Sequence, residues 1–142
     1  LITPLLFLSA CASGDAVTIE NVERSLSAIN SAVNKSFPGG IKTRSSNGRE
    51  LYSHPFSPDS MLADTKGLYN FDERAFLKAI VLGDRRPYDI EVYSRIEVKT
   101  KTGSYRFKKT DKALSDRIRK KITEELIKSQ NDKDIIDNFT PY

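Results

Sequence analysis

Reactive side chains are few in this sequence, and two of them are single representatives of their type. The chain has one Cys and one His in 142 residues. A single Cys excludes an internal disulfide and a CxxC metal or redox motif, and a single His excludes a His-rich metal site. We therefore expect no metal and no cofactor, and any reactive chemistry should concern Cys11 or His54.

His54 is the one candidate for a general base. Ser53, Ser57 and Ser60 lie near it in sequence, and Asp59 could orient its ring, as a hydrolase would require. The segment has no Gly-x-Ser-x-Gly elbow, however, and no glycine that would support a nucleophile in a loop. We therefore expect no enzymatic activity, and a small hydrolase that uses His54 is the alternative.

Cys11 follows a segment of unusual composition. Residues 1–10 contain no charged side chain and are mostly apolar. This is shorter than the ~20 residues of a membrane-spanning helix, and it approaches the apolar region of a secretory signal, which has about 7–15 residues. Small residues, Ser9 and Ala10, precede the Cys. The sequence starts with Leu rather than Met, so we expect that a few residues are missing before it.

The sequence Leu-Ser-Ala-Cys at residues 8–11 resembles the lipobox of bacterial lipoproteins. The resemblance covers only this segment, and a buried structural Cys is the alternative. It implies that residues 1–10 are a signal peptide, that Cys11 carries a diacylglyceryl group, and that residues 11–17 tether the domain to a membrane. Ala12, not Asp, follows the Cys, and the resemblance then favours the periplasmic face of the outer membrane.

Basic residues are concentrated in the second half of the chain. Residues 84–128 hold fourteen basic and eight acidic side chains, a net charge of +6. Such a block can attract an anionic surface. We expect an anionic glycolipid or an envelope protein as partner and, because the chain is exported, no nucleic acid. The candidate anion- or partner-binding residues are Arg85, Arg86, Tyr88, Arg117, Lys120 and Lys121. The alternative is that these are ordinary solvated side chains.

Two amphipathic helices are expected to cover a sheet. Apolar residues three or four positions apart predict a helix over 18–36, with Thr18 as its N-cap. The same spacing predicts a basic helix over 111–129. The remaining residues, 130–142, form a polar tail that we expect to pack loosely or to be disordered.

Strand patterns lie between these helices. Asn47-Gly48 predicts a hairpin turn between short strands at 41–45 and 50–53. Residues 54–70 show no regular spacing of apolar residues and are expected to form a long irregular connection. Apolar and polar residues alternate over 88–99, interrupted only by Ser94, and the alternation resumes over 104–109. Residues 73–82 fit a helix or a strand, and we favour a strand over 74–82 that completes a three-stranded antiparallel meander.

These patterns predict one α+β domain over residues 18–129. An antiparallel sheet, made of the meander and a possible short hairpin, is covered on one face by the two helices in a two-layer arrangement. We predict a lipid-anchored envelope protein whose domain is a non-catalytic binding or assembly module. The alternative within this class is an accessory subunit of a multiprotein envelope or secretion complex.

Overall fold

The computed structural model describes the backbone of residues 16–139 and the side chains of residues 16–130. The predicted signal peptide, Cys11 and most of the predicted tether therefore lie outside the described residues. Within the described residues, none of the helices combines the length and the apolar character that crossing a membrane requires.

One antiparallel sheet of six strands forms the framework of the domain. The strands run in the order β1-β5-β4-β3-β2, and β6 also pairs with β5. Their bounds are β1 (Val17–Val22), β2 (Ile41–Arg44), β3 (Glu50–Ser53), β4 (Glu73–Leu82), β5 (Tyr88–Lys99) and β6 (Tyr105–Lys109). The predicted meander is β4-β5-β6 and the predicted short hairpin is β2-β3, so both are confirmed. Residues 74–82 form a strand, as we favoured.

The long strand β5 organises the sheet. β4 pairs with it from Glu73↔Val98 to Leu82↔Asp89 and so covers one edge over almost its whole length. The other edge is shared: β1 pairs with the first part of β5, and β6 pairs with the last part. The start of β1 and the end of β6 consequently lie on the same edge of the molecule.

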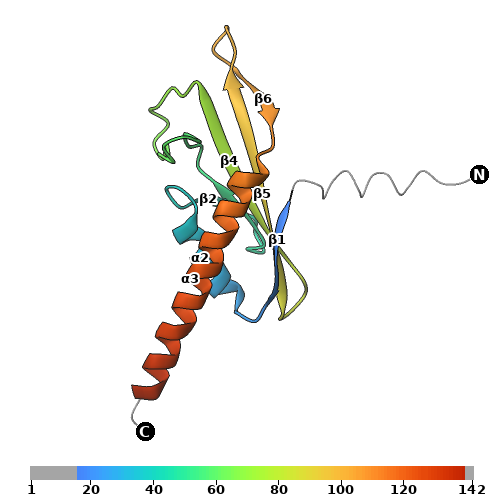
Figure 1. Ribbon diagram of the computed structural model, residues 1–142, viewed down its shortest axis with the longest axis vertical. Coiled ribbons are helices and arrows are strands. Elements are labelled where there is room, and N and C mark those ends of the chain that lie inside the picture. Colours follow the sequence, from blue (N-terminus) through green and yellow to red (C-terminus); the bar gives the residue numbers. More distant parts are fainter. Residues whose placement is uncertain (1–15, 140–142) are drawn as a thin grey trace, which may run out of the picture.

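Two helices, α2 (Leu26–Ser36) and α3 (Lys112–Phe139), pack against each other and lie on one face of the sheet (Figure 1). α3 also contacts β5 and β1. The core lies between these layers and includes Ile29, Val33, Leu51, Phe56, Leu77, Ile90, Val92, Ile118 and Ile122, each at most 1% exposed. The predicted two-layer α+β architecture is therefore confirmed.

The predicted helix over 18–36 is wrong over residues 18–25, and Ser25, not Thr18, is the N-cap. Residues Val17–Val22 form β1, and the helix starts only after Ser25, whose hydroxyl accepts a hydrogen bond from the Ala28 N–H at 3.1 Å. The register between β1 and β5 shifts between Ile19 and Val22, where Asn21 has a φ of 55°. This bulge inserts a residue, so the spacing of three from Ile19 to Val22 imitates a helical period in a strand.

The second helix is longer than predicted. α3 continues from Lys112 to Phe139, so the helix does not end at residue 129 and most of the predicted polar tail is helical. Among the α3 side chains that the structure describes, up to residue 130, the last buried apolar one is Leu126. Residues 128–134 contain no apolar residue, so the apolar spacing is interrupted there and did not reveal this continuation.

Candidate functional site

The face of the sheet turned away from the helices carries a set of aromatic and basic side chains, which we call the open face. It is formed by Tyr52, Arg74, Phe76, Lys78, Tyr93, Arg95, Glu97, Tyr105 and Phe107. Successive strand residues point to opposite faces, and the alternate residues of β4 and β5 fill the core on the helix side. Among the described elements, the two helices lie on that opposite side.

Aromatic rings and cations alternate across neighbouring strands of the open face. Lys78 lies between Tyr52 on one side and Tyr93 on the other in the sheet register. Its Nζ lies 5.2 Å from the centre of the Tyr93 ring. Phe76 is paired with Arg95 in the next row. Strand pairing therefore places Lys78 and Arg95 beside aromatic residues, and the Lys78–Tyr93 pair has the geometry of a cation–π contact.

The two arginines also contact aromatic rings. The Arg74 guanidinium carbon lies 3.7 Å from the centre of the Tyr105 ring and 5.0 Å from that of Phe76. The corresponding distance from Arg95 to Phe107 is 4.8 Å. These contacts hold the arginines along the surface of the sheet, where their planar groups remain partly exposed.

Glu97 joins the two arginines. Its Oε1 lies 2.9 Å from Arg74 Nη2, and its Oε2 lies 2.8 Å from Arg95 Nε. Burial alone would raise the pKa of Glu97, but the hydrogen bonds and charges of Arg95 and Arg74 outweigh it and hold that pKa below its ordinary value. The carboxylate is therefore ionised at neutral pH and fixes both guanidinium groups.

Tyr93 has a comparable carboxylate partner. Its hydroxyl donates a hydrogen bond of 3.1 Å to Glu91 Oε1. Burial, and then the hydrogen bond to Glu91 and its negative charge, raise the pKa of Tyr93 above its ordinary value. The phenol consequently stays protonated at neutral pH and acts as a hydrogen-bond donor.

A shallow hollow of about 330 Å³ lies on the open face. Its walls include Tyr52, Phe76, Tyr93 and Phe107. Tyr52 and Phe107 are 38% and 48% exposed, so their rings are accessible to a partner. The arrangement offers flat apolar surface together with oriented donors, which suits binding of another surface.

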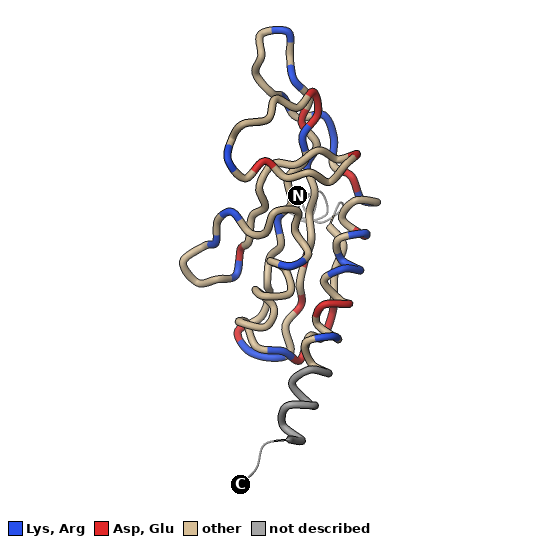
Figure 2. The backbone as a smooth tube through the Cα atoms, turned by 90° about the vertical axis from the view of Figure 1, so that its left-hand side faces the viewer, with Lys and Arg blue, Asp and Glu red and all other residues tan. Residues whose placement is uncertain are grey.

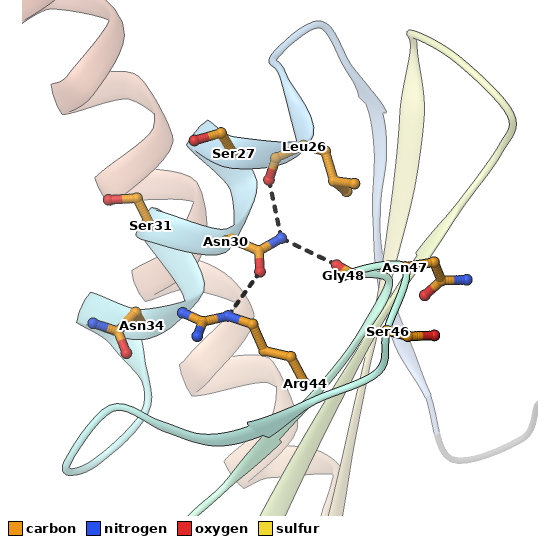
Figure 3. Close-up of a pocket in the computed structure, with 9 residues that line it drawn as sticks. All are labelled: Leu26, Ser27, Asn30, Ser31, Asn34, Arg44, Ser46, Asn47 and Gly48. Atoms are coloured by element: carbon orange, nitrogen blue, oxygen red, sulfur yellow. Dashed lines mark hydrogen bonds between the residues drawn. The ribbon is translucent and has the colours of Figure 1, made fainter.

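A second, more polar hollow lies between α2 and the turn that joins β2 to β3 (Figure 3). Asn30 is at its centre: its Nδ2 donates to the carbonyls of Leu26 and Gly48, and its Oδ1 accepts from Arg44 Nε at 3.1 Å. The side chain of Asn30 therefore fastens the β2–β3 turn to the helix. Its amide groups are engaged in this structural role.

The predicted cluster Arg85, Arg86 and Tyr88 is divided by the fold. The two arginines are exposed in the turn between β4 and β5. The Tyr88 side chain is 9% exposed and belongs to the core, so it does not join them on the surface. Arg49 fastens this turn instead, because its guanidinium donates to the carbonyls of Gly83 and Asp84.

The predicted basic side of α3 is exposed at Arg117, Lys120 and Lys121. Arg117 and Lys121 line a hollow of about 170 Å³ beside the end of α2. Lys120 is not among its lining residues; its Nζ lies 3.5 Å from Asp116 Oδ2. The structure therefore brings two of these three residues to one hollow, and their binding role stays a prediction.

The residues around His54 are engaged in structural hydrogen bonds. The Ser53 hydroxyl is buried, donates to the His54 carbonyl at 2.9 Å and accepts from the Leu77 N–H at 2.8 Å. Ser57 and Ser60 accept from nearby backbone N–H groups. The Ser53 hydroxyl thus joins β3 to β4, and the fold does not direct it to the imidazole.

The open face was missed by the sequence analysis, although a signal for it was present. Phe76, Lys78, Tyr93, Arg95 and Phe107 lie on the polar side of the predicted strands, where an aromatic residue is unexpected. Their alternation with basic residues appears only when the strands are placed in register. Cys11, the predicted lipid-attachment residue, lies outside the described residues.

Comparison of the chain with protein-family models, with curated proteins and with solved structures finds no significant match. Among the described residues, there is also no group of three or more His, Cys, Asp or Glu side chains placed to hold a metal ion. Function must therefore be argued from the residues and their geometry.

Proposed function

We propose that this chain is a lipid-anchored bacterial envelope protein whose α+β domain binds another envelope protein through the open face. The observation that carries the anchor is the sequence Leu-Ser-Ala-Cys at residues 8–11, directly after an uncharged apolar segment. Cleavage before Cys11 would remove residues 1–10, and Cys11 would then be the first residue of the mature chain. One acyl chain holds a protein only marginally, whereas two or more hold it firmly at a membrane.

Metabolic labelling tests the anchor. Cells that express the chain are grown with an alkyne-tagged palmitate, and we expect the protein to be labelled. Cys11→Ser should abolish the labelling, because no other Cys exists in the chain. Ser13→Ala, two residues away, is the matched control and should be labelled fully. Labelling of the Cys11→Ser variant at the level of the control would refute the anchor.

The open face supports a protein as partner. The cores of protein–protein interfaces are enriched in Tyr, Phe and Arg and depleted in Lys and Glu. Tyr52, Phe76, Tyr93 and Phe107 provide such rings, and Arg74 and Arg95 lie flat beside them. The carboxylate of Glu97 neutralises part of their charge, so a partner need not supply a strongly acidic surface. This face favours a binding or assembly role.

Association in the envelope tests the binding role. The protein is extracted in mild detergent from cross-linked cells, and we expect a partner to co-purify in fixed stoichiometry. Tyr52→Ala combined with Phe107→Ala should lower that yield at least ten-fold, since both rings are exposed on the open face. The control is Ile127→Ala, which removes an apolar side chain that is 57% exposed on α3, on the opposite side of the sheet. Equal yields from both variants would exclude the open face as the binding surface.

A further inference from the structure

The point at which the tether enters the fold restricts how a lipid-anchored domain can face its membrane. Val17, the first residue of β1, is paired with Val92 on the edge of β5. Lys109, the last residue of β6, is paired with Ile96 on the same edge. Four residues of strand separate these partners, which corresponds to about 13 Å. The tether therefore begins close to β6.

The tether itself is short. Five Cα–Cα steps separate Ala16, the first described residue, from Cys11. A fully extended chain spans at most about 3.6 Å per residue, so the Cα atom of Cys11 lies within about 18 Å of Ala16. A lipid on Cys11 therefore holds this edge of the sheet near the bilayer. The opposite edge, at β2, is four strand spacings away from β6, about 19 Å across the sheet.

The tether brings the β6 edge of the sheet to the bilayer, and the side chains around β6 are mostly basic. Residues 99–112 contain six basic side chains and one acidic side chain, and we call them the basic edge: Lys99, Lys101, Arg106, Lys108, Lys109 and Lys112 against Asp111. Figure 2 shows basic residues at the tip of the β5–β6 hairpin and further basic residues below it. Arg106, Lys109 and Lys112 are exposed, whereas Lys108 also contacts Glu73 at 2.7 Å.

Along the edge of β5 that β1 and β6 share, basic side chains gather at β6 and acidic side chains at the end of β1. The other end of β1 and the residue after it carry exposed acidic side chains, Glu20 and Glu23. Of the surfaces next to the tether, the basic edge is thus the one that an anionic bilayer attracts. Basic residues act on such a surface within about one Debye length, roughly 8 Å at physiological salt, and the tether allows that approach.

We infer that the basic edge lies against the anionic phospholipid headgroups of the bilayer that holds the lipid on Cys11. This inference rests on the proposed anchor. In that orientation the plane of the sheet stands upright on the membrane, the β2–β3 hairpin is farthest from it, and the open face is directed sideways, where a membrane-bound partner can reach it. The short tether brings the edge close, and the charges of the basic edge select the orientation.

Fluorescence quenching from lipid headgroups tests this orientation in the full lipidated protein, reconstituted in vesicles. Because Cys11 is the sole Cys and its thiol is blocked by the lipid, a newly introduced Cys is the one site for a thiol-reactive fluorophore. Thr110→Cys places the dye beside β6, and Thr43→Cys places it on β2 at the opposite edge. Both positions are exposed, so the two labelled proteins form a matched pair.

Vesicles of phosphatidylcholine mixed with phosphatidylglycerol carry a quencher on their headgroups. We expect strong quenching of the dye at Thr110→Cys and little at Thr43→Cys. Replacing Arg106, Lys109 and Lys112 by Gln should shift the docking equilibrium by about a hundred-fold, because each basic residue near an anionic surface contributes roughly five-fold. Lys35, Lys42 and Lys66, all exposed, are replaced by Gln in the control, which removes the same charge elsewhere.

The readouts separate the anchor from the orientation. Flotation with the vesicles reports the anchor, and a chain that does not float refutes both proposals. If the chain floats but the two dyes are quenched equally, the orientation alone is overturned. It is also overturned if vesicles of pure phosphatidylcholine give the same difference between the dyes, or if the two triple variants behave alike. Loss of the Thr110→Cys quenching in high salt would support the electrostatic origin.

Discussion

The Ser94 hydroxyl holds the backbone of Asp111 at both of its polar groups. Ser94 Oγ donates to the Asp111 carbonyl at 2.6 Å and accepts from the Asp111 N–H at 3.0 Å. Asp111 in turn caps α3, since its Oδ1 accepts from the Leu114 N–H at 3.1 Å. One buried side chain of the central strand thus fixes the point at which the longer helix begins, and with it the packing of α3 on the sheet.

Ser94→Ala should destabilise the domain. The substitution leaves the Asp111 N–H and carbonyl without their strand partner, and a lost buried hydrogen bond of this kind costs about 1–3 kcal/mol. Urea unfolding followed by circular dichroism measures the change. Ser46→Ala, at an exposed position in the β2–β3 turn, should change the free energy of unfolding by less than about 0.5 kcal/mol. Equal stabilities for the two variants would contradict this role of Ser94.

Ser94 also shows what periodicity can and cannot predict. The alternation over residues 88–99 correctly predicts β5 and the face it buries, because a strand with one buried face requires a period of two. The pattern treats Ser94 only as an interruption. Its role depends on Asp111, seventeen residues further along the chain, and no local pattern contains such a contact.

β1 and the open face were missed for related physical reasons. The bulge at Asn21 gives β1 an apolar spacing that a helix also produces, and pairing with β5 decides between them. The open face depends on register: Lys78 meets Tyr93, and Phe76 meets Arg95, only after β4 and β5 are aligned. The lipid-attachment prediction is different in kind, because its signal is a short local motif.

Acid should weaken the domain partly through Glu97. The pKa of this carboxyl is lowered in the folded state, so its contribution to stability is fully present above the unfolded pKa of about 4.3. That contribution is lost as pH falls through the lower folded value. Glu97→Gln should therefore be less stable than the original chain at pH 7 and should lose less stability on acidification. Urea unfolding at a series of pH values tests this, and parallel pH curves would contradict it.

Substitution of Gly39 and of Gly103 by Ala distinguishes two causes of lost stability, backbone strain and steric overlap of the added Cβ. Both have positive φ values, 73° and 88°, which L side chains rarely adopt. A Cβ on Gly39 would lie 2.6 Å from Ala63 Cβ and 2.9 Å from Thr65 Cγ2, whereas at Gly103 it would meet no atom within 4 Å. Gly103→Ala should cost about 1–2 kcal/mol from the backbone alone, and Gly39→Ala clearly more. Thermal unfolding of the two variants measures the difference, and equal losses would show that the loop at Ala63 adjusts freely.

Replacement of Ser115 by Ala should stabilise the domain, whereas replacement of Ser94 by Ala should destabilise it. Its hydroxyl is fully buried, and it is the one buried side-chain polar atom among the described residues that lacks a hydrogen-bond partner. A helical Ser commonly donates to the carbonyl four residues earlier. Here that carbonyl belongs to Asp111, and it already accepts from the Ser115 N–H and from Ser94 Oγ. A carbonyl oxygen has two lone pairs, so Ser94 occupies the place that Ser115 would use.

Ser115→Ala should therefore stabilise the domain by about 1 kcal/mol, because it removes an unsatisfied buried hydroxyl and Ala favours a helix. The two sites should also be coupled. In the Ser94→Ala background, the Ser115 hydroxyl can take the vacant lone pair of Asp111, and Ser115→Ala should then destabilise. A double-mutant cycle measured by urea unfolding gives this coupling directly. Additive effects of the two substitutions would show that the hydroxyls do not compete for one carbonyl.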